Sequence, residues 1–149
     1  MDEMTTPKEL ALAASKAMWN RDNATHALGM ELVSVAPGLA VLRMKVRSDM
    51  VNGHHICHGG LIFTLADSAF AYACNSYNLN TVASGCSIDF LAPGREGDVL
   101  EASAVERSSA GRTGVYDVEV KVVGGSTVAL FRGRSYRIKG EVIAGLESH

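Results

Sequence analysis

Apolar and polar residues alternate along much of the second half of this chain, which is the pattern of strands with one buried face. In the segment 115–123, for example, Tyr116 and Val118 alternate with Asp117 and Glu119. Strand-like runs of this kind are expected over four segments, residues 81–91, 99–107, 115–123 and 127–139. Turn-forming glycine, proline and serine residues separate them, so the four strands follow one another through short connections.

The first half of the chain predicts a short helix and a hairpin. The helix is expected over residues 7–20, where proline occupies the first turn and small apolar residues recur at helical spacing. It belongs to an N-terminal helical extension over residues 1–22. The segments 30–35 and 39–47 alternate on either side of a Pro-Gly turn and predict a hairpin with one solvated face.

A longer helix is expected over residues 61–77, and it is apolar on nearly every side. Such a helix must be enclosed, because all its faces avoid water. The order of elements therefore predicts an α+β fold in which a mainly antiparallel six-stranded sheet wraps one long central helix. The open edges of that sheet favour association of two copies. We expect a single domain over residues 1–149, with a loose tail at 140–149.

Composition narrows the classes of function. The chain has 149 residues, of which 47% are hydrophobic, so it can bury a core of its own. Its net charge of −2, without a basic stripe, argues against binding to nucleic acid. The acidic start and the interrupted apolar stretches predict neither a secretory leader nor a membrane span. Three cysteines without a C-x-x-C pair favour a reducing compartment, and we expect the protein in the cytoplasm.

The densest group of reactive side chains is the run 52–60, Asn-Gly-His-His-Ile-Cys-His-Gly-Gly, directly before the central helix. A second Cys/His cluster that would complete a zinc site is missing from the sequence, so we expect no metal site. Motifs for a serine nucleophile elbow and for phosphate-binding loops are also missing. Cations crowd the last strand, either as a solvated edge or as a rim for ligand phosphates: Arg132, Arg134, Arg137 and Lys139.

Asp67 is the only charged residue between His58 and Asp89, and it lies within the predicted central helix. Burying a carboxylate is costly unless it is hydrogen-bonded or has a chemical task. Desolvation would raise its pKa towards that of a useful general base. A structural aspartate that bonds a neighbouring strand is the alternative, and the residue types alone leave both open.

Gly59 and Gly60 precede the helix and present their N–H groups at the positive end of its dipole, where an oxyanion could be received. A tight entry into the helix is the alternative explanation for this pair. Gly59 lies eight residues before Asp67, which is roughly 12 Å along the axis at about 1.5 Å per residue. One carbonyl cannot contact both residues within one helix. A site that uses both must therefore be shared between two subunits.

Several longer motifs include these residues. They are N-G-H-x-x-C-H-G-G over 52–60, F-x-L-A-D-x-A-F-A-Y-A-C-N-S over 63–76, I-D-F-L-x-P-G over 88–94 and T-G-V-Y-D over 113–117. With these motifs the chain resembles the phenylacetic acid degradation thioesterases, which belong to the hotdog-fold acyl-CoA thioesterase family. The likeness extends from about residue 27 to residue 138.

That resemblance implies a hotdog fold and hydrolysis of an acyl-CoA thioester without metal or other cofactor. Phenylacetyl-CoA or its ring-hydroxylated relatives are the implied substrates, and homodimers with shared active sites, usually paired into homotetramers, are the implied assembly. Position by position, it assigns the catalytic acid to Asp67, the oxyanion-binding glycine to Gly59 and an asparagine near the thioester to Asn52. In that family Asp67 comes from the subunit opposite the other two. We expect further contacts with the substrate from five residues, His58, Gly60, Ser84, Arg132 and Arg134.

Alternatives remain within this interpretation. The carboxylate of Asp67 could attack the carbonyl or activate water, because one carboxylate can serve either role. His55 and Ile56 depart from the family's pattern and could reshape the acyl pocket, which leaves the acyl group open. A hotdog hydratase or dehydratase would pair His58 with Asp67 across subunits. A non-catalytic acyl-CoA sensor would bind in the same cleft without turnover.

Overall fold

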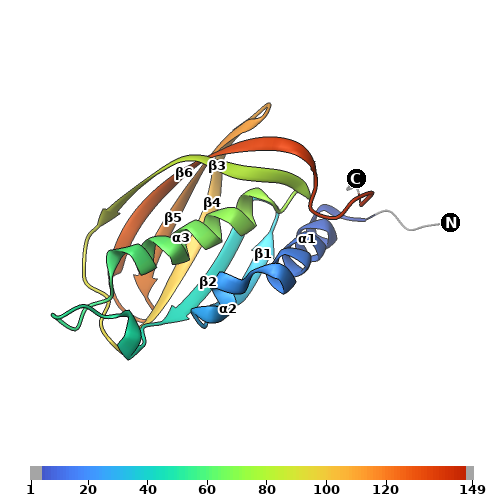
Figure 1. Cartoon of the computed structure of the whole chain (residues 1–149). Coiled ribbons are helices and arrows are strands. Elements are labelled where there is room, and N and C mark those ends of the chain that lie inside the picture. The colour runs from blue at the N-terminus through green and yellow to red at the C-terminus, as the bar shows by residue number, and fades with distance from the viewer. Residues whose placement is uncertain (1–4, 147–149) are drawn as a thin grey trace.

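An antiparallel sheet wraps around helix α3 (Gly59–Cys74) in the computed structural model, which describes residues 5–146 (Figure 1). The strands are β1 (Glu31–Ala36), β2 (Leu39–Lys45), β3 (Leu79–Phe90), β4 (Val99–Ala110), β5 (Thr113–Val122) and β6 (Thr127–Glu141). They form one six-stranded sheet in the order β1-β2-β4-β5-β6-β3, and every neighbouring pair is antiparallel. The predicted α+β architecture is confirmed.

Helix α3 begins and ends earlier than the predicted range 61–77. It begins earlier because both glycines before residue 61 adopt helical backbone. It ends earlier because Asn75 turns its side chain back onto the backbone. The Asn75 amide donates to the carbonyl oxygens of Ala71 at 2.9 Å and Thr81 at 3.0 Å, and its oxygen accepts from the Thr81 N–H at 2.9 Å. The C-terminal end of α3 is thereby tied to β3.

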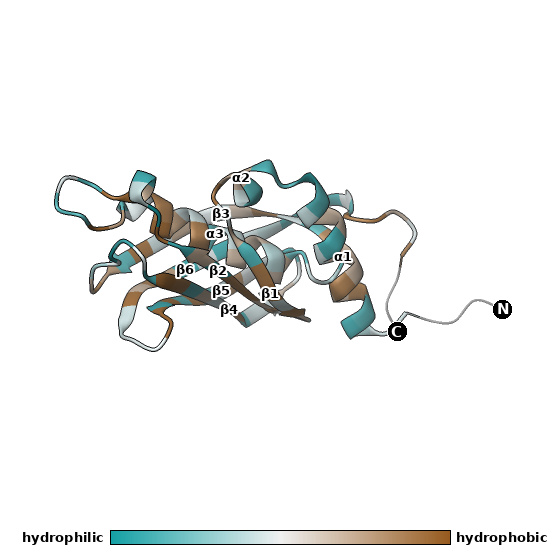
Figure 2. Cartoon of the chain, turned by 90° about the horizontal axis from the view of Figure 1, so that it is seen from below, coloured by the Kyte–Doolittle hydropathy of each residue, from teal (hydrophilic) through white to brown (hydrophobic). Residues whose placement is uncertain are grey.

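The inner face of the sheet packs on α3 through a contiguous apolar core. Leu65, Phe70 and Tyr72 of α3 are each at most 1% exposed. At Gly133 of β6 a Cβ atom would lie only 2.8 Å from the Phe70 ring. Glycine therefore lets the helix lie close against the sheet. Figure 2 shows the hydrophobic residues gathered on α3 and the strands that enclose it.

Helix α1 (Pro7–Arg21) lies within the predicted N-terminal extension over residues 1–22, of which residues 1–4 fall outside the described residues, and α2 (Asn23–Ala27) follows directly after that range. The Thr6 hydroxyl caps α1 by accepting from the Glu9 N–H at 3.1 Å. The Tyr72 hydroxyl donates to Asp22 at 3.1 Å and joins α3 to the connection between the first two helices. Both helices lie beside β1 and cover that end of the sheet (Figure 1).

The prediction of a loose tail over residues 140–149 is wrong for residues 140–146. Strand β6 continues to Glu141, and the chain after it is held by Asn78. The Asn78 amide donates to the carbonyl oxygens of Ile143 at 2.8 Å and Leu146 at 2.7 Å, while its oxygen accepts from the Ile143 N–H at 2.8 Å. Residues 147–149 lie outside the described residues.

The fold separates two ends of the molecule. The loop between β2 and α3 lies at one end, and the start of α1 and the end of β6 lie at the other (Figure 1). Strand β3 forms one edge of the sheet and β1 the other. Among residues 5–146, no helix has the length and apolar character needed to cross a membrane.

Candidate active site

Asn52 holds the loop before α3 in a compact turn. Its side-chain oxygen accepts hydrogen bonds from the N–H groups of His54 at 2.9 Å and Ile56 at 3.3 Å. Its own backbone N–H donates to the Ile56 carbonyl at 2.9 Å. His55, at the tip, adopts a left-handed backbone with φ of 62°. Because the carboxamide NH₂ group takes no part in these bonds, Asn52 can both shape the loop and donate to a ligand.

Gly59 and Gly60 open α3 with free N–H groups. The His58 carbonyl accepts from the N–H groups of Leu61 at 3.0 Å and Ile62 at 3.3 Å, and no side chain caps the helix. Within the described residues, the N–H groups of the two glycines donate to no acceptor. They stand at the positive end of a 16-residue helix. This is the arrangement that binds a carbonyl oxygen on which negative charge develops.

The two glycines differ in their surroundings. A Cβ atom at Gly59 would lie 3.0 Å from the tip of the Phe90 ring, whereas one at Gly60 would have no heavy atom within 4 Å. The Phe90 ring therefore covers Gly59 and leaves Gly60 facing solvent. A carbonyl bound at Gly59 would lie beside an aromatic surface.

A cavity of about 650 Å³ opens at this position, and we call it the Gly59 cavity. Asn52 and Gly59 both line it, so the structure brings these two predicted residues together. The rest of its wall is mostly apolar, with one cation: Ile56, Ile62, Phe90, Leu91, Pro93 and Arg95. Asp67 does not line this cavity, which agrees with the spacing argument that one chain cannot bring Gly59 and Asp67 together.

Asp67 lies half-buried on α3, and burial raises the pKa of its carboxyl group above the ordinary value of 3.8. Within residues 5–146 its carboxylate makes no ion pair or hydrogen bond. Burial is the main cause of the raised pKa of the Cys86 thiol on β3, and the charge of Asp67 raises it further. A purely structural role would require a hydrogen bond from Asp67 to a neighbouring strand. The described part of the chain contains no such bond.

The other predicted substrate contacts are spread over the molecule. His58 and Gly60 are exposed beside Gly59. The Ser84 hydroxyl, on edge strand β3, donates to the Arg134 carbonyl at 3.2 Å. Arg132 donates two hydrogen bonds to Asp117, at 2.6 and 2.9 Å. The structure thus brings neither Arg132 nor Arg134 to the Gly59 cavity. Among the described residues, no group of three or more His, Cys, Asp or Glu side chains could hold a metal ion.

The aromatic cover and the cation of the cavity are not predictable from the sequence pattern. Phe90 and Leu91 are about half exposed, at 52% and 57%. Nothing local in the motif over 88–94 indicates that this strand end lies over Gly59. Arg95 lies across an isolated bridge from Ile56, which again only the fold reveals.

A sheet wrapped around one helix, a glycine-opened helix terminus and an aspartate within that helix define a hotdog-fold thioesterase. The chain belongs to the Thioesterase superfamily, whose sequence model matches residues 54–129. It is 52% identical to acyl-coenzyme A thioesterase PaaI of Escherichia coli (strain K12) over 126 residues, which are 85% of this chain and 90% of that protein.

Solved structures agree with this membership. The structure of the E. coli PaaI protein from the phenylacetic acid degradation operon superposes with a TM-score of 0.90 at 49% identity, covering 91% of this chain and 99% of that one. A hypothetical thioesterase protein of Streptococcus pneumoniae TIGR4, solved with coenzyme A, gives a TM-score of 0.71 at 27% identity, over 75% and 87% of the two chains. The predicted hotdog fold and thioesterase family are confirmed.

Proposed function

We propose that this thioesterase hydrolyses acyl-CoA thioesters, with phenylacetyl-CoA or a ring-hydroxylated phenylacetyl-CoA preferred, and so serves phenylacetate degradation. The observation that carries the proposal is the free N–H group of Gly59 inside an apolar, aromatic-lined cavity. A planar phenyl ring suits a wall built by Phe90 and Leu91, because aromatic rings pack favourably edge to face or offset. The 52% identity to PaaI supports the choice of substrate.

In this proposal, Gly59 and Asp67 have different roles in the hydrolysis of the thioester. The thioester carbonyl oxygen accepts a hydrogen bond from the Gly59 N–H, which stabilises the negative charge that develops on it. Asp67 either adds its carboxylate to the carbonyl carbon or takes a proton from an attacking water. The carbon–sulfur bond breaks and CoA leaves as a thiol. The net addition of one water yields the free acid. The NH₂ group of Asn52 donates a hydrogen bond near the thioester.

Each active site takes residues from two chains. Gly59 lies beside Phe90 of β3, and Asp67 lies eight residues further along α3, or about 12 Å. A two-fold axis that crosses the middle of this separation would set Gly59 of each chain against Asp67 of the other. Strand β3 is an edge of the sheet with 12 residues, which suits antiparallel pairing with its own copy.

A homotetramer formed from two such dimers completes the proposed assembly. The sheet and α1 expose several large apolar side chains that a second dimer would cover: Leu12, Val33, Leu39, Leu130 and Tyr136. The three cysteines are unpaired thiols, which is the state expected in a reducing compartment, and we place the enzyme in the cytoplasm.

Thiol release from a panel of CoA esters tests the proposal. The panel comprises phenylacetyl-CoA, a hydroxyphenylacetyl-CoA, a short straight-chain acyl-CoA and a long one. The aromatic esters are expected to be cleaved fastest, and Asp67→Asn to abolish cleavage. The matched control is Glu31→Gln, which removes an exposed carboxylate from β1, at the opposite edge of the sheet from β3. Tight binding of the esters without release by the unmodified protein would contradict the proposal and favour an acyl-CoA sensor.

A further inference from the structure

Arg95 lines the Gly59 cavity as a cation without a partner. It is the one arginine or lysine among the described residues of the cavity wall, and none of these residues is an aspartate or a glutamate. Within residues 5–146, the Arg95 guanidinium forms no ion pair with a carboxylate. Arg107 and Arg132, by contrast, are both held by Asp117. The hydrogen-bond donors of Arg95 are therefore free for a ligand.

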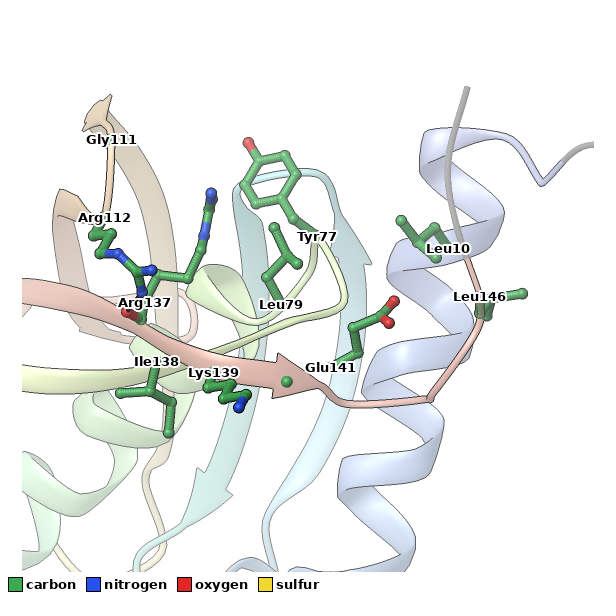
Figure 3. A pocket seen from close by; sticks show the side chains of 11 residues that line it. Leu10, Tyr77, Leu79, Gly111, Arg112, Arg137, Ile138, Lys139, Glu141 and Leu146 are labelled. Atoms are coloured by element: carbon green, nitrogen blue, oxygen red, sulfur yellow. Dashed lines mark hydrogen bonds between the residues drawn. The ribbon is translucent and has the colours of Figure 1, made fainter.

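A second cleft, at the end of the molecule that holds the start of α1 and the end of β6, has a different balance of charge (Figure 3). Its cations are accompanied by the carboxylate of Glu141. One guanidinium nitrogen of Arg112 there donates to the Arg137 carbonyl at 3.2 Å. The Gly59 cavity differs from this cleft because it combines a single free cation with mostly apolar walls.

The backbone fixes the position of Arg95 at the cavity, although its side chain is exposed. The Arg95 N–H donates to the Asp98 carboxylate at 2.9 Å, and the Asp98 N–H donates to the Arg95 carbonyl at 2.9 Å. An isolated antiparallel bridge joins Arg95 to Ile56. Next to this bridge, the Cys57 N–H donates to the Gly94 carbonyl at 2.7 Å. The segment that carries Arg95 is thereby attached to the loop before α3.

Arg95 lies within reach of a ligand that is bound at Gly59. Gly59 follows Ile56 by three residues. Three extended residues span at most about 11 Å, and bridged residues of antiparallel strands lie about 5 Å apart. The Cα atom of Arg95 therefore lies within roughly 16 Å of Gly59. Both residues line one cavity, so an acyl group with its carbonyl oxygen at Gly59 can present its far end to the Arg95 side chain.

We propose that Arg95 selects acyl groups that carry a carboxylate at the end opposite the thioester, so that the protein also hydrolyses CoA esters of aromatic dicarboxylic acids. This inference rests on the proposed function, because it takes the substrate to be an acyl-CoA whose carbonyl is bound at Gly59. The ring of the acyl group packs against Phe90 and Leu91, and its carboxylate accepts hydrogen bonds from the Arg95 guanidinium. Water cleaves only the thioester, which yields CoA as a thiol and the free dicarboxylic acid.

Electrostatics favour a carboxylate over a hydroxyl group at this position. The planar guanidinium fork matches the two oxygens of a carboxylate, and hydrogen bonds between charged partners are stronger than those to a neutral hydroxyl. The positive end of the α3 dipole adds to the attraction. Because Arg95 is exposed, water and salt weaken the contact. We therefore expect a moderate preference for the charged acyl group, of about fivefold.

Two esters of similar shape and different charge test the inference. They are 4-carboxyphenylacetyl-CoA and 4-carbamoylphenylacetyl-CoA, and the measurement is the ratio of their kcat/KM values from thiol release. The unmodified protein is expected to prefer the carboxylate by about fivefold at low salt, and by less in about 0.5 M NaCl. Because both esters are measured with the same protein preparation, the fraction of folded protein cancels from the ratio.

Substitutions at Arg95 are expected to change this ratio in a graded way. Arg95→Gln should bring it to about one, because the charge is lost, whereas Arg95→Lys should keep part of the preference. Arg95→Glu should invert the preference, because like charges repel. Arg21→Gln is the matched control and should leave the ratio unchanged, since it removes an exposed arginine of α1 that does not line the cavity.

The outcomes separate this inference from the proposed function. If the unmodified protein cleaves neither of these esters nor phenylacetyl-CoA, the proposed function fails. If it cleaves phenylacetyl-CoA and shows no preference for the carboxylate, only the inference fails. A preference that Arg95→Gln leaves unchanged would overturn the role of Arg95. A preference for 4-hydroxyphenylacetyl-CoA over the carboxylated ester, lost in Arg95→Gln, would assign Arg95 to a ring hydroxyl and overturn the carboxylate.

Discussion

Asp67 lies in a partly apolar environment, which governs both its chemistry and its cost to the fold. Burial raises its pKa in the folded state above the ordinary value of 3.8. Ionisation of Asp67 therefore destabilises the fold at neutral pH, and this penalty disappears as the pH falls towards 3.8, where the unfolded chain also becomes protonated. The residue is kept at a position where an uncharged side chain would be more stable, as expected of a functional group.

Replacing Asp67 with Asn should therefore raise Tm at neutral pH while abolishing thioester cleavage. The gain in Tm should shrink as the pH is lowered towards 3.8, because the penalty that the substitution removes is then absent. Thermal unfolding followed by circular dichroism at a series of pH values measures this gain, with Glu31→Gln on β1 as the exposed control. A gain that is independent of pH would contradict the burial of a charged carboxylate in the folded state.

Gly59 and Gly60 provide a matched pair for the oxyanion site. A Cβ atom at Gly59 meets the Phe90 ring at 3.0 Å, whereas one at Gly60 has open space. Gly59→Ala should lower kcat for phenylacetyl-CoA by about 100-fold, because displacing a reacting group by a fraction of an ångström has a large effect on rate. Gly60→Ala should leave kcat within about twofold. Equal losses in the two variants would show that Phe90 does not position the substrate.

Among the elements, the connection from α3 to β3 ties the C-terminal end of α3 to the segment after β6. Asn75 ends the helix by bonding to Thr81 of β3, and Asn78 binds the chain after β6. Asn78 is 1% exposed and has a left-handed backbone with φ of 66°. One residue thus joins the turn after α3 to the segment that follows β6.

Substitutions at Asn78 separate its hydrogen bonds from its backbone conformation. Asn78→Gly should lower the free energy of unfolding by about 2–4 kcal/mol, because four partly buried side-chain hydrogen bonds are lost while the left-handed backbone stays accessible. Asn78→Ala should cost about 1 kcal/mol more, since alanine disfavours that conformation. Urea unfolding of both variants measures the difference. Equal stabilities would mean that the left-handed conformation relaxes at no cost.

In the whole molecule, a site that uses both Gly59 and Asp67 would need two chains, because one rigid helix keeps these residues apart. The structure of a single chain agrees, because the Gly59 cavity includes Asn52 and not Asp67. Strand β3 is both the open edge of the sheet and the strand that carries Phe90 over Gly59. Pairing of two β3 strands would therefore close the sheet edge and complete two sites together.

Complementation between inactive chains checks this arrangement. Equal amounts of Gly59→Ala and Asp67→Asn chains, unfolded and refolded together, should recover about a quarter of the unmodified activity, because half of the dimers are mixed and each mixed dimer keeps one of its two sites. Thiol release from phenylacetyl-CoA measures the recovery, and each variant refolded alone is the control. Mixtures as inactive as their parents would contradict a shared site.

The sequence by itself determined the architecture and the family. The alternation of the strands and the apolar character of the helix both follow from which faces are buried. The order of helices and strands in the α+β fold could therefore be predicted from the hydrophobic pattern. The isolated charge of Asp67 and the glycines before α3 were equally visible. The ends of the elements were less visible in the sequence, because Asn75 and Asn78 bond to residues that lie outside α3.

The tertiary structure alone decided which residues of different elements meet. Phe90 covers Gly59, 31 positions apart in the chain, and Arg132 is paired with Asp117. Arg112 and Arg137, 25 positions apart, are joined by two hydrogen bonds, from the Arg137 N–H to the Arg112 carbonyl and from the Arg112 guanidinium to the Arg137 carbonyl. Such encounters depend on strand register and on the curvature of the sheet around α3, and no local pattern of residues encodes either of these. Local periodicity therefore sufficed for the elements and their order, whereas the surroundings of the reacting groups required the folded chain.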